Sequence, residues 1–258
     1  MSLIGVVGDG CTTTALGIAA AWAPNDPCMI AEFDPAGGCL AAWLDLPRSP
    51  GLAEVAASST PGSWSAIQAS VQRSVSGIDV LLAPTRAVEA VAVIHAGSTS
   101  VLPVLAAIDS SVVIADGGRL RGALSALAIR SDIVIIAHRQ NSGSAAAATL
   151  GLERVAELTS LLAARAIPAV VALIGDRPYS SAEVADFVEA DAVVALAHDP
   201  WAAAVLAGRA GPAIRLRRSP LMRSFAGLAG VISSRLRHLH LQSLPPSLYD
   251  ERLVDDLR

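Results

Sequence analysis

The 258-residue sequence predicts an α/β fold, with a mostly parallel sheet flanked by helices, from three observations. Short β-branched runs alternate with longer helical patterns, which is typical of strand–helix–strand units. Hydrophobic residues make up 53% of the chain but aromatic residues only 3%, and much of the apolar content is alanine. This composition favours helices packed closely on a sheet over a β-sandwich. The length fits one large domain.

The predicted elements follow one another in a regular order. Strands are predicted at residues 3–7, 28–33, 78–83, 111–115, 133–137, 169–174 and 192–196, where short apolar and β-branched runs occur. Helices are predicted at residues 13–22, 143–165, 181–188 and 221–241, where the apolar spacing is helical. Loops are predicted at residues 8–10, which are glycine-rich, and at residues 58–65, which are rich in Ser, Thr, Pro and Gly.

Composition also bears on location and partners. No run of about 18 apolar residues is present, so we expect no membrane span. The N-terminus lacks a basic region, so we expect no signal peptide. The cysteines Cys11, Cys28 and Cys39 lack metal-ligand spacing, which favours reduced thiols in a cytoplasmic protein. The net charge of −4 excludes a whole-protein polycation for nucleic acid, and all 19 Lys and Arg positions are arginine.

A glycine-rich loop lies between the first predicted strand and the next helix. It reads Gly5-Val6-Val7-Gly8-Asp9-Gly10-Cys11-Thr12. This fits the phosphate-binding pattern G-x-x-x-x-G-K-[ST] except that Cys11 replaces the lysine. Backbone N–H groups and the helix N-terminus still favour a phosphate there, and the Thr12 hydroxyl is a ligand for Mg²⁺. The ammonium that offsets phosphate charge is lost, and Asp9 adds a carboxylate beside the phosphate path.

Two aspartates follow other predicted strands. Asp34 comes after the second strand, and Asp116 follows the fourth. Ligands of open parallel sheets lie at the carboxyl ends of the strands, so we expect both aspartates near the glycine loop, serving Mg²⁺ and an attacking water. The competing interpretation is a plain glycine turn, with each aspartate acting as a turn or helix N-cap residue.

The loop and the aspartate segments together resemble the ParA/MinD group of P-loop proteins. The matching runs are Glu32-Phe33-Asp34-Pro35-Ala36-Gly37-Gly38, Asp116 and Ser131-Asp132-Ile133-Val134-Ile135. That group has a loop of the form K-G-G-x-G-K-T-T, whereas here Val6 and Cys11 stand at the two lysines. The chain contains no lysine that another segment could donate. In these losses it is most similar to the TadZ/CpaE branch and to short actinobacterial MinD-like proteins.

The resemblance implies a ParA/MinD-like P-loop domain over residues 1–210. Residues 211–258 then form an Arg-rich C-terminal helix and tail, packed on or extending that domain. The resemblance implies ATP or ADP with Mg²⁺ as the cofactor, or no cofactor if the loop has lost its function. It also implies a homodimer, a cytoplasmic location and recruitment to a membrane or cell pole.

Individual roles also follow from the resemblance. The residues that it places at a nucleotide are Gly8, Asp9, Gly10, Cys11, Thr12, Thr13, Asp176 and Arg177. Asp34 would orient the attacking water, while Asp116 and Thr12 would hold Mg²⁺. Asp176 stands where the family has asparagine and, with Arg177, falls where the family meets the adenine. The run His198-Asp199-Pro200 falls on a later loop that either approaches the base or is solvated.

The C-terminal region carries a cluster of arginines. Its members are Arg215, Arg217, Arg218, Arg223, Arg235 and Arg237. Three interpretations remain open for them: a plain solvated face, a surface that binds DNA, or an amphipathic helix on an anionic membrane.

Three functions compete. The first is a localisation or scaffold protein of a Tad pilus, secretion or partition apparatus, with nucleotide bound weakly or only structurally. The second is a slow ATPase that cycles between monomer and dimer and borrows charge from Arg119 or Arg121. The third is a non-catalytic DNA-binding partition module. Losing a transition-state charge commonly lowers a rate by a factor of about a thousand, so we expect weak or undetectable turnover.

Overall fold

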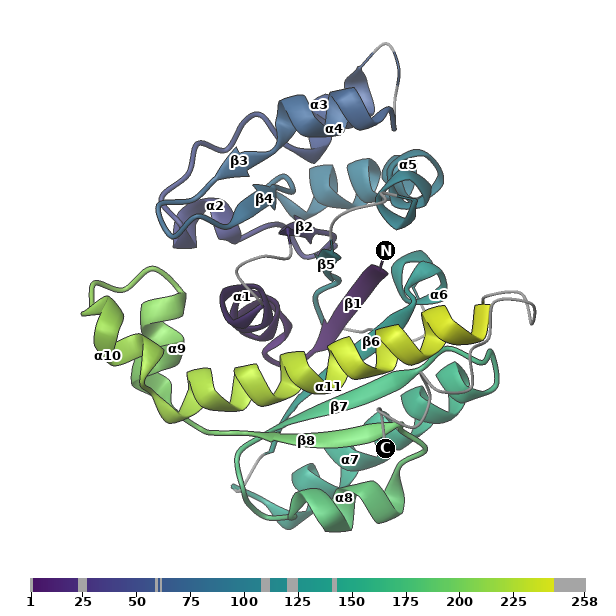
Figure 1. The fold of residues 1–258 in the computed structure, drawn as a ribbon, viewed down its shortest axis with the longest axis vertical. Helices are drawn as coiled ribbons and strands as arrows, with labels where there is room; N and C mark the ends of the chain where they lie inside the picture. The colour runs from purple at the N-terminus through teal and green to yellow at the C-terminus, as the bar shows by residue number, and fades with distance from the viewer. Residues whose placement is uncertain are drawn as a thin grey trace.

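One mostly parallel sheet organises the protein. The computed structural model describes residues 2–22, 27–58, 60, 62–107, 112–119, 125–140 and 143–243. Within these residues the sheet has eight strands in the order β3-β4-β2-β5-β1-β6-β7-β8 (Figure 1). The strands are β1 (Ser2–Gly8), β2 (Cys28–Glu32), β3 (Gln72–Arg73), β4 (Asp79–Leu81), β5 (Val112–Asp116), β6 (Ile133–Arg139), β7 (Ala169–Ile174) and β8 (Ala192–Leu196). The predicted α/β fold class is confirmed.

The predicted strand positions are close to those observed, with three corrections that matter. The strand predicted at residues 78–83 is shorter, since β4 spans only Asp79–Leu81. β6 continues to Arg139, two residues beyond its predicted end, because those residues still pair with β7. The prediction also missed β3, which has only two residues and so shows no periodicity. Ser111, the predicted start of β5, lies outside the described residues.

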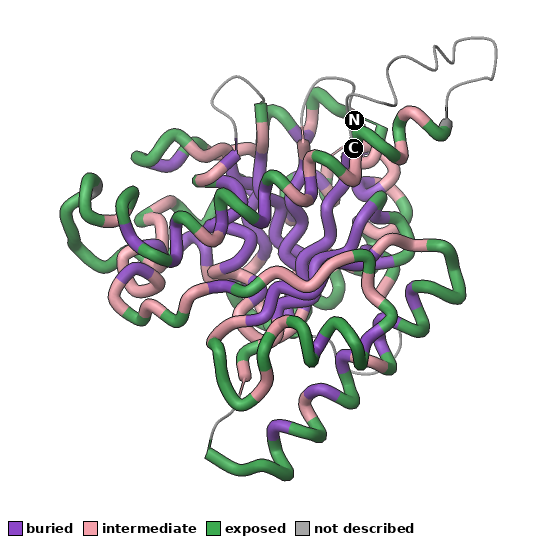
Figure 2. Tube along the Cα trace, turned by 60° about the horizontal axis from the view of Figure 1, so that its bottom comes forward, coloured by how far each residue is buried: buried purple, intermediate pink, exposed green. Residues whose placement is uncertain are grey.

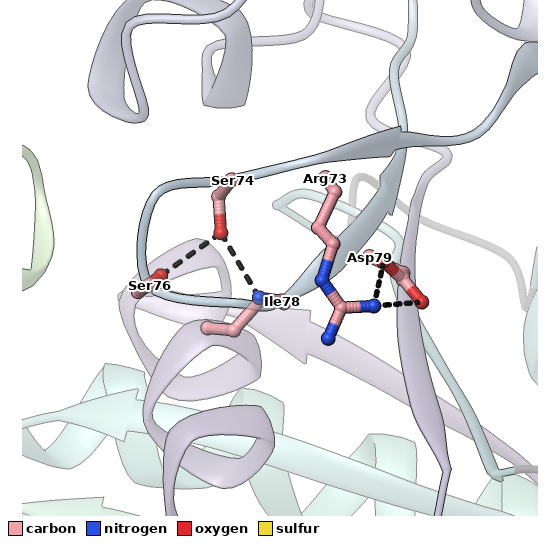
Figure 3. A network of polar contacts seen from close by, with 5 residues as sticks. All are labelled: Arg73, Ser74, Ser76, Ile78 and Asp79. Carbon is pink, nitrogen blue, oxygen red and sulfur yellow. Dashed lines mark hydrogen bonds and ion pairs between the residues drawn. The ribbon is translucent and has the colours of Figure 1, made fainter.

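β3 and β4 form an antiparallel hairpin at the edge of the sheet (Figure 3). Arg73 Nη1 donates to Asp79 Oδ1 across the pair at 3.1 Å. In the turn, the backbone N–H of Ile78 donates to Ser74 Oγ at 3.0 Å, and the hydroxyls of Ser74 and Ser76 lie 2.9 Å apart. Local polar contacts therefore define a strand that hydrophobic spacing could not reveal.

Helices cover both faces of the sheet. They are α1 (Cys11–Ala21), α2 (Leu40–Trp43), α3 (Leu52–Ala57), α4 (Trp64–Ser70), α5 (Ala87–Ala106), α6 (Ala126–Arg130), α7 (Ala145–Ala163), α8 (Ser181–Phe187), α9 (Pro200–Leu206), α10 (Ala213–Arg217) and α11 (Pro220–Ser243). Along β1, Ile4 and Val6 contribute to the core under α1, whereas Leu3 and Val7 contribute to the cores on the other face. Figure 2 shows the buried strands between helices whose outer turns are exposed.

Two predicted boundaries near helices need correction. The predicted 58–65 loop ends earlier, because α4 begins at Trp64 and the Ser63 hydroxyl accepts the N–H of Ala66 at 3.2 Å as an N-cap. The first predicted helix begins at Cys11 rather than at Thr13.

α11 is part of the central core. Its apolar face includes Phe225, Leu228 and Ile232, which are at most 1% exposed. It packs on α1 and β8, and an added Cβ at Gly17 of α1 would lie 2.1 Å from the Phe225 ring. The missing side chain at Gly17 therefore lets the two helices approach closely. Residues 244–258, the rest of the predicted tail, lie outside the described residues.

α5 is long and apolar enough to cross a membrane, by length and composition only. No membrane span was expected from the sequence. Mostly buried core helices of soluble proteins pass the same test; in α5, Val101, Leu102 and Leu105 are buried against the sheet, but only 28% of the apolar window is buried. The helix also contains Glu89 and packs against α3 and α6.

Candidate nucleotide-binding site

A cavity of about 660 Å³ opens at the carboxyl edge of the sheet. It lies where β1 sits between β5 and β6, so that the strand order reverses there. Such a point is where open α/β sheets bind their ligands. We call it the front cavity; its lining includes Gly8, Asp9, Gly10, Cys11, Thr12, Thr13, Asp34, Trp43, Arg119 and Arg139.

The glycines of the loop make its tight path possible. Gly8 and Gly10 have φ values of 105° and 94°, in the region that favours glycine. An added Cβ at Gly8 would lie 2.2 Å from the carbonyl oxygen of Ala137 on β6. The Gly8 N–H donates to the carbonyl of Gly118 at 3.0 Å, which ties the loop to the end of β5.

The first turn of α1 presents free backbone donors to the front cavity. The helix begins at Cys11, and its first backbone hydrogen bond runs from Thr14 N–H to the Gly10 carbonyl at 2.9 Å. The N–H groups of Cys11, Thr12 and Thr13 therefore lack partners within the helix, and no side chain caps this end. All three residues line the cavity, so the backbone suits a phosphate group.

Asp116 lies beneath this loop and is only 1% exposed. Its Oδ1 accepts the N–H of Gly118 at 3.1 Å. Burial raises the pKa of Asp116, although hydrogen bonds from Thr12, Gly118 and Cys11 lower it in part. The structure thus brings together Thr12 and Asp116, whose oxygens are the donors that Mg²⁺ prefers.

Asp34 approaches from the loop after β2. Its Oδ1 accepts the N–H of Ala36 at 2.7 Å, and an added Cβ at Gly118 would lie 2.2 Å from that oxygen. The carboxylates of Asp34 and Asp116 thus flank Gly118, as the strand-end argument predicts.

The two positions that hold lysines in the ParA/MinD pattern are buried in this chain. Val6 is fully buried in the middle of β1 and packs in the core under α1. Cys11 is 5% exposed, and its Sγ lies 3.9 Å from Thr12 Oγ1. Burial, followed by the charge of Asp116, raises the pKa of the Cys11 thiol far above the physiological range. The thiol is therefore neutral and supplies no charge to a phosphate.

The cations of the front cavity come from neighbouring strands. Among the described residues, Arg119 and Arg139 are the basic side chains that line it. Arg119 Nη2 lies 3.2 Å from Asp9 Oδ1, so this arginine is already paired. Arg139 has no ion pair within the described part of the chain. Arg121, the other predicted charge donor, lies outside the described residues.

Sequence reasoning missed Arg139. Arg139 is the last residue of β6, and the predicted strand ended two residues earlier, so Arg139 was not placed at the cavity. A signal was present, because the β-branched pattern of β6 leads directly into a basic residue at the carboxyl edge.

Sequence reasoning also gave no role to Glu32, which ends β2. It is 1% exposed, and its Oε1 accepts the N–H groups of Cys39 and Leu40 at 2.8 Å. Its Oε2 accepts the N–H of Ala83 at 3.0 Å. Burial raises the pKa of Glu32 to about 7 despite these three donors. Glu32 thus holds the start of α2 and the end of the β4 segment beside the cavity.

The predicted base-binding residues are only partly brought together with the loop. Asp176 and Arg177 are exposed after β7 and do not line the front cavity. The run His198-Asp199-Pro200 lines a small neighbouring cavity of about 40 Å³, together with Thr13 and Arg139.

No protein-family model matches this sequence, and no curated protein sequence is similar to it. Solved structures do match the fold. A ParA family ATPase from Chlorobium tepidum superposes with a TM-score of 0.67 at 16% identity, covering 88% of this chain and 97% of the other. A chain of the MinC:MinD cell division complex from Aquifex aeolicus gives 0.67 at 13% identity, covering 95% and 98%.

A third structure contains a nucleotide. It is the septum site-determining protein MinD with Mg-ADP from Pyrococcus horikoshii, with a TM-score of 0.64 at 14% identity over 90% of this chain and 95% of that one. From its sheet order, its phosphate loop and these superpositions, the chain has the α/β fold of the ParA and MinD ATPases.

Proposed function

We propose that this protein is a ParA/MinD-like positioning or recruitment factor that binds nucleotide weakly and hydrolyses it slowly or not at all. The observation that carries the proposal is the front cavity, which is lined by free helix amides, Thr12 and Asp34 and has Asp116 buried beneath its loop, but has a neutral thiol at the loop lysine position. Bound Mg-ATP would supply a transferable phosphoryl group and a divalent cation. The chain itself supplies backbone amides that would bind the phosphates and oxygen atoms that would coordinate the cation. It supplies too little positive charge to accelerate phosphoryl transfer.

The proposed site would work as follows. The first-turn N–H groups of α1 would hold the phosphates, while Thr12 and Asp116 would hold Mg²⁺. Asp34, opposite Gly118, would orient a water. Asp176, Arg177 and the segment from His198 to Pro200 would meet the base after a local rearrangement.

The cellular role that we propose follows the named functions of the structural neighbours. A complex of MinD with MinC and a ParA family ATPase are both among them. We therefore propose a cytoplasmic homodimer that recruits a protein apparatus to a membrane or cell pole. The degenerate loop favours the TadZ/CpaE-like role in a Tad pilus or secretion apparatus over a cycling motor.

A steady-state assay of phosphate release with Asp34→Ala as a paired variant tests the catalytic part of this proposal. We expect turnover near the detection limit in both proteins. A fluorescent fusion should still form discrete foci when Asp34 is replaced. Ordinary turnover that disappears in Asp34→Ala, or foci that disperse with it, would instead establish an ATP-driven switch.

Arg139 supports a second candidate function, an ATP-driven switch between monomer and dimer. A guanidinium at the end of β6 stabilises a transferring phosphate, although it cannot enter the loop as lysine does. The oligomeric state separates the two candidates, since a slow switch needs nucleotide-dependent dimerisation. Light scattering with and without Mg-ATP measures this directly.

The C-terminal arginines support DNA or an anionic membrane as a further partner. Arg217, Arg218 and Arg223 are exposed, whereas Arg215 stacks on Trp201 at 4.3 Å and Arg235 Nη2 donates to the Asp191 carbonyl at 2.7 Å. A DNA-binding module predicts salt-sensitive binding that is lost when Arg215, Arg217 and Arg218 become alanine. Binding that is absent, or insensitive to salt, removes the DNA candidate.

A further inference from the structure

A second cavity, of about 350 Å³, lies between the phosphate loop and α7. We call it the back cavity. Its walls come from Gly8 and Asp9 of the loop, the end of β6 and the inner face of α7. It shares Asp9, Arg119 and Arg139 with the front cavity, so the Asp9–Arg119 ion pair belongs to the wall between the two.

The back cavity is rich in positive charge. Arg119, Arg139 and Arg154 line it, and Asp9 is the one carboxylate among its lining residues. The guanidinium groups come from three different elements, namely the segment after β5, the end of β6 and α7. The local excess of positive charge contrasts with the net charge of −4 of the whole chain.

Asp9 does not neutralise this cavity. Its Oδ1 lies 3.2 Å from Arg119, which leaves Arg139 and Arg154 without an ion pair among the described residues. Both arginines are exposed and line the same hollow, so their guanidinium groups are available to an anion from solution. Guanidinium groups bind phosphate and carboxylate groups in a two-pronged geometry.

His138 adds a further donor to the same wall. It is half-buried at the end of β6, and an added Cβ at Gly151 of α7 would lie 2.9 Å from its Cε1. Gly151 thus leaves room for the imidazole between strand and helix. The ring belongs to the lining of the back cavity and not to that of the front cavity.

We propose that the back cavity is a binding site for a small free anion that carries a phosphate or carboxylate group, held by Arg139 and Arg154 beside His138. The site goes beyond the proposed function and does not require nucleotide to bind. Its ligand would share Arg119 and Arg139 with the front cavity, so occupancy of one cavity changes the charge available to the other. Arg154 and His138 distinguish it from the phosphate loop.

Titration with inorganic phosphate and, separately, with succinate tests this site. The readout is the ring-proton NMR signal of His138. Because the chain has five histidines, this signal is assigned by its loss in His138→Asn. We expect the His138 signal to shift with one or both anions at concentrations below about 10 mM. Arg154→Gln should weaken anion binding at least about tenfold, because the variant removes one charged hydrogen-bonding group.

Two further variants keep the outcome decisive. Arg165→Gln, which removes an exposed arginine beyond the end of α7, should leave anion binding unchanged. Ala147→Leu, which enlarges a side chain that lines the cavity without changing charge, should weaken it, and a thermal unfolding curve shows whether that variant is folded. The proposal is overturned if neither anion shifts His138 in this range, or if binding is unchanged in Arg154→Gln, because the anion then lies elsewhere.

Discussion

The front and back cavities share a wall but differ in charge. The front cavity is lined by Asp34 and Cys11, whose thiol is neutral, with Asp116 buried beneath the loop, and its cations lie on its walls. The back cavity has guanidinium groups from three elements and one paired carboxylate. Positive charge that a P-loop normally carries in the loop itself is here supplied by the neighbouring strands.

The difference shows that the backbone path of the glycine loop and the positive charge near it depend on different residues in this fold. The loop path depends on Gly8, Gly10 and the start of α1, and all of these are present. The charge depends on single side chains, and the two positions where the ParA/MinD pattern has lysine are Val6 within β1 and Cys11 at the start of α1. A phosphate-shaped site can therefore persist without the electrostatics that make it a fast catalyst.

The largest expected effect comes from Cys11→Lys, which restores charge to the front cavity. Because Asp116 lies beside this position, the ammonium would be paired and held at the phosphates. We expect turnover to rise by a factor of up to about a thousand and Mg-ATP binding to tighten at least tenfold. Phosphate release and calorimetry measure the two effects.

The matched control is Cys11→Met, which is long but uncharged and should produce no gain. A rise in both variants would mean that side-chain length, and not charge, limits the front cavity. The contrast between the two cavities would then lose its electrostatic basis.

Phe225→Ala tests how much the packing of α11 on α1 contributes to the free energy of unfolding. Phe225 is 1% exposed and packs against α1, which follows the glycine loop, whereas the back cavity is lined by α7. We expect a loss of roughly 3–5 kcal/mol in the free energy of unfolding, measured by urea denaturation. Phe187→Ala, at a phenylalanine that is 53% exposed, should cost less than about 1 kcal/mol. Equal losses would show that α11 is not part of the core.

Glu32 tests the buried acid that ends β2 beside the front cavity. Burial raises its pKa to about 7 from 4.5, so the folded protein keeps a proton that the unfolded chain releases between these values. The stability from neutral Glu32 is thus present below pH 4.5 and lost as the pH rises through 7. The free energy of unfolding should fall by up to about 1.4 kcal/mol per pH unit across this window.

Urea denaturation at several pH values measures this fall. It should shrink in Glu32→Gln, which does not titrate, and persist in Glu157→Gln, at an exposed position of α7. An unchanged pH profile in Glu32→Gln would mean that another group holds the proton.

The smallest effect is expected for Asp9→Asn, which alters the shared wall. The variant removes a carboxylate beside the phosphate path and releases Arg119, so Mg-ATP binding should tighten by a few fold. The ion pair is largely exposed, so the free energy of unfolding should change by less than about 1 kcal/mol. Asp186→Asn, at an exposed site on α8, should change neither quantity. Weaker nucleotide binding in Asp9→Asn would show that the ion pair organises the cavity.

Much of the fold follows from the sequence because the central strands are buried on both faces. The run at residues 169–174 matches β7, which is buried almost throughout, and the run at residues 192–196 matches the edge strand β8, which is only partly buried. The β3–β4 hairpin could not be predicted this way, because polar contacts of Arg73 and Ser74 define it. Short helices such as α2 also have too few turns to show a period.

The site was predictable as far as strand ends could be located. Thr12, Asp34 and Asp116 follow strands whose ends were clear, and the structure groups them around the loop. Arg139 was missed because the predicted strand ended at residue 137, two residues before β6 ends. Glu32 was undervalued because its role comes from amides of Cys39 and Ala83, which only the folded chain brings together.

Calorimetric titration of the dialysed protein with Mg-ATP tests the central claim most directly. We predict weak binding, with a Kd between roughly 100 µM and 1 mM, that becomes weaker in Arg139→Gln and is unchanged in Arg154→Gln. This result would mean that helix amides, oxygen ligands and a wall arginine suffice without a loop lysine. No heat at millimolar Mg-ATP, or binding unaffected by Arg139→Gln, would contradict the account.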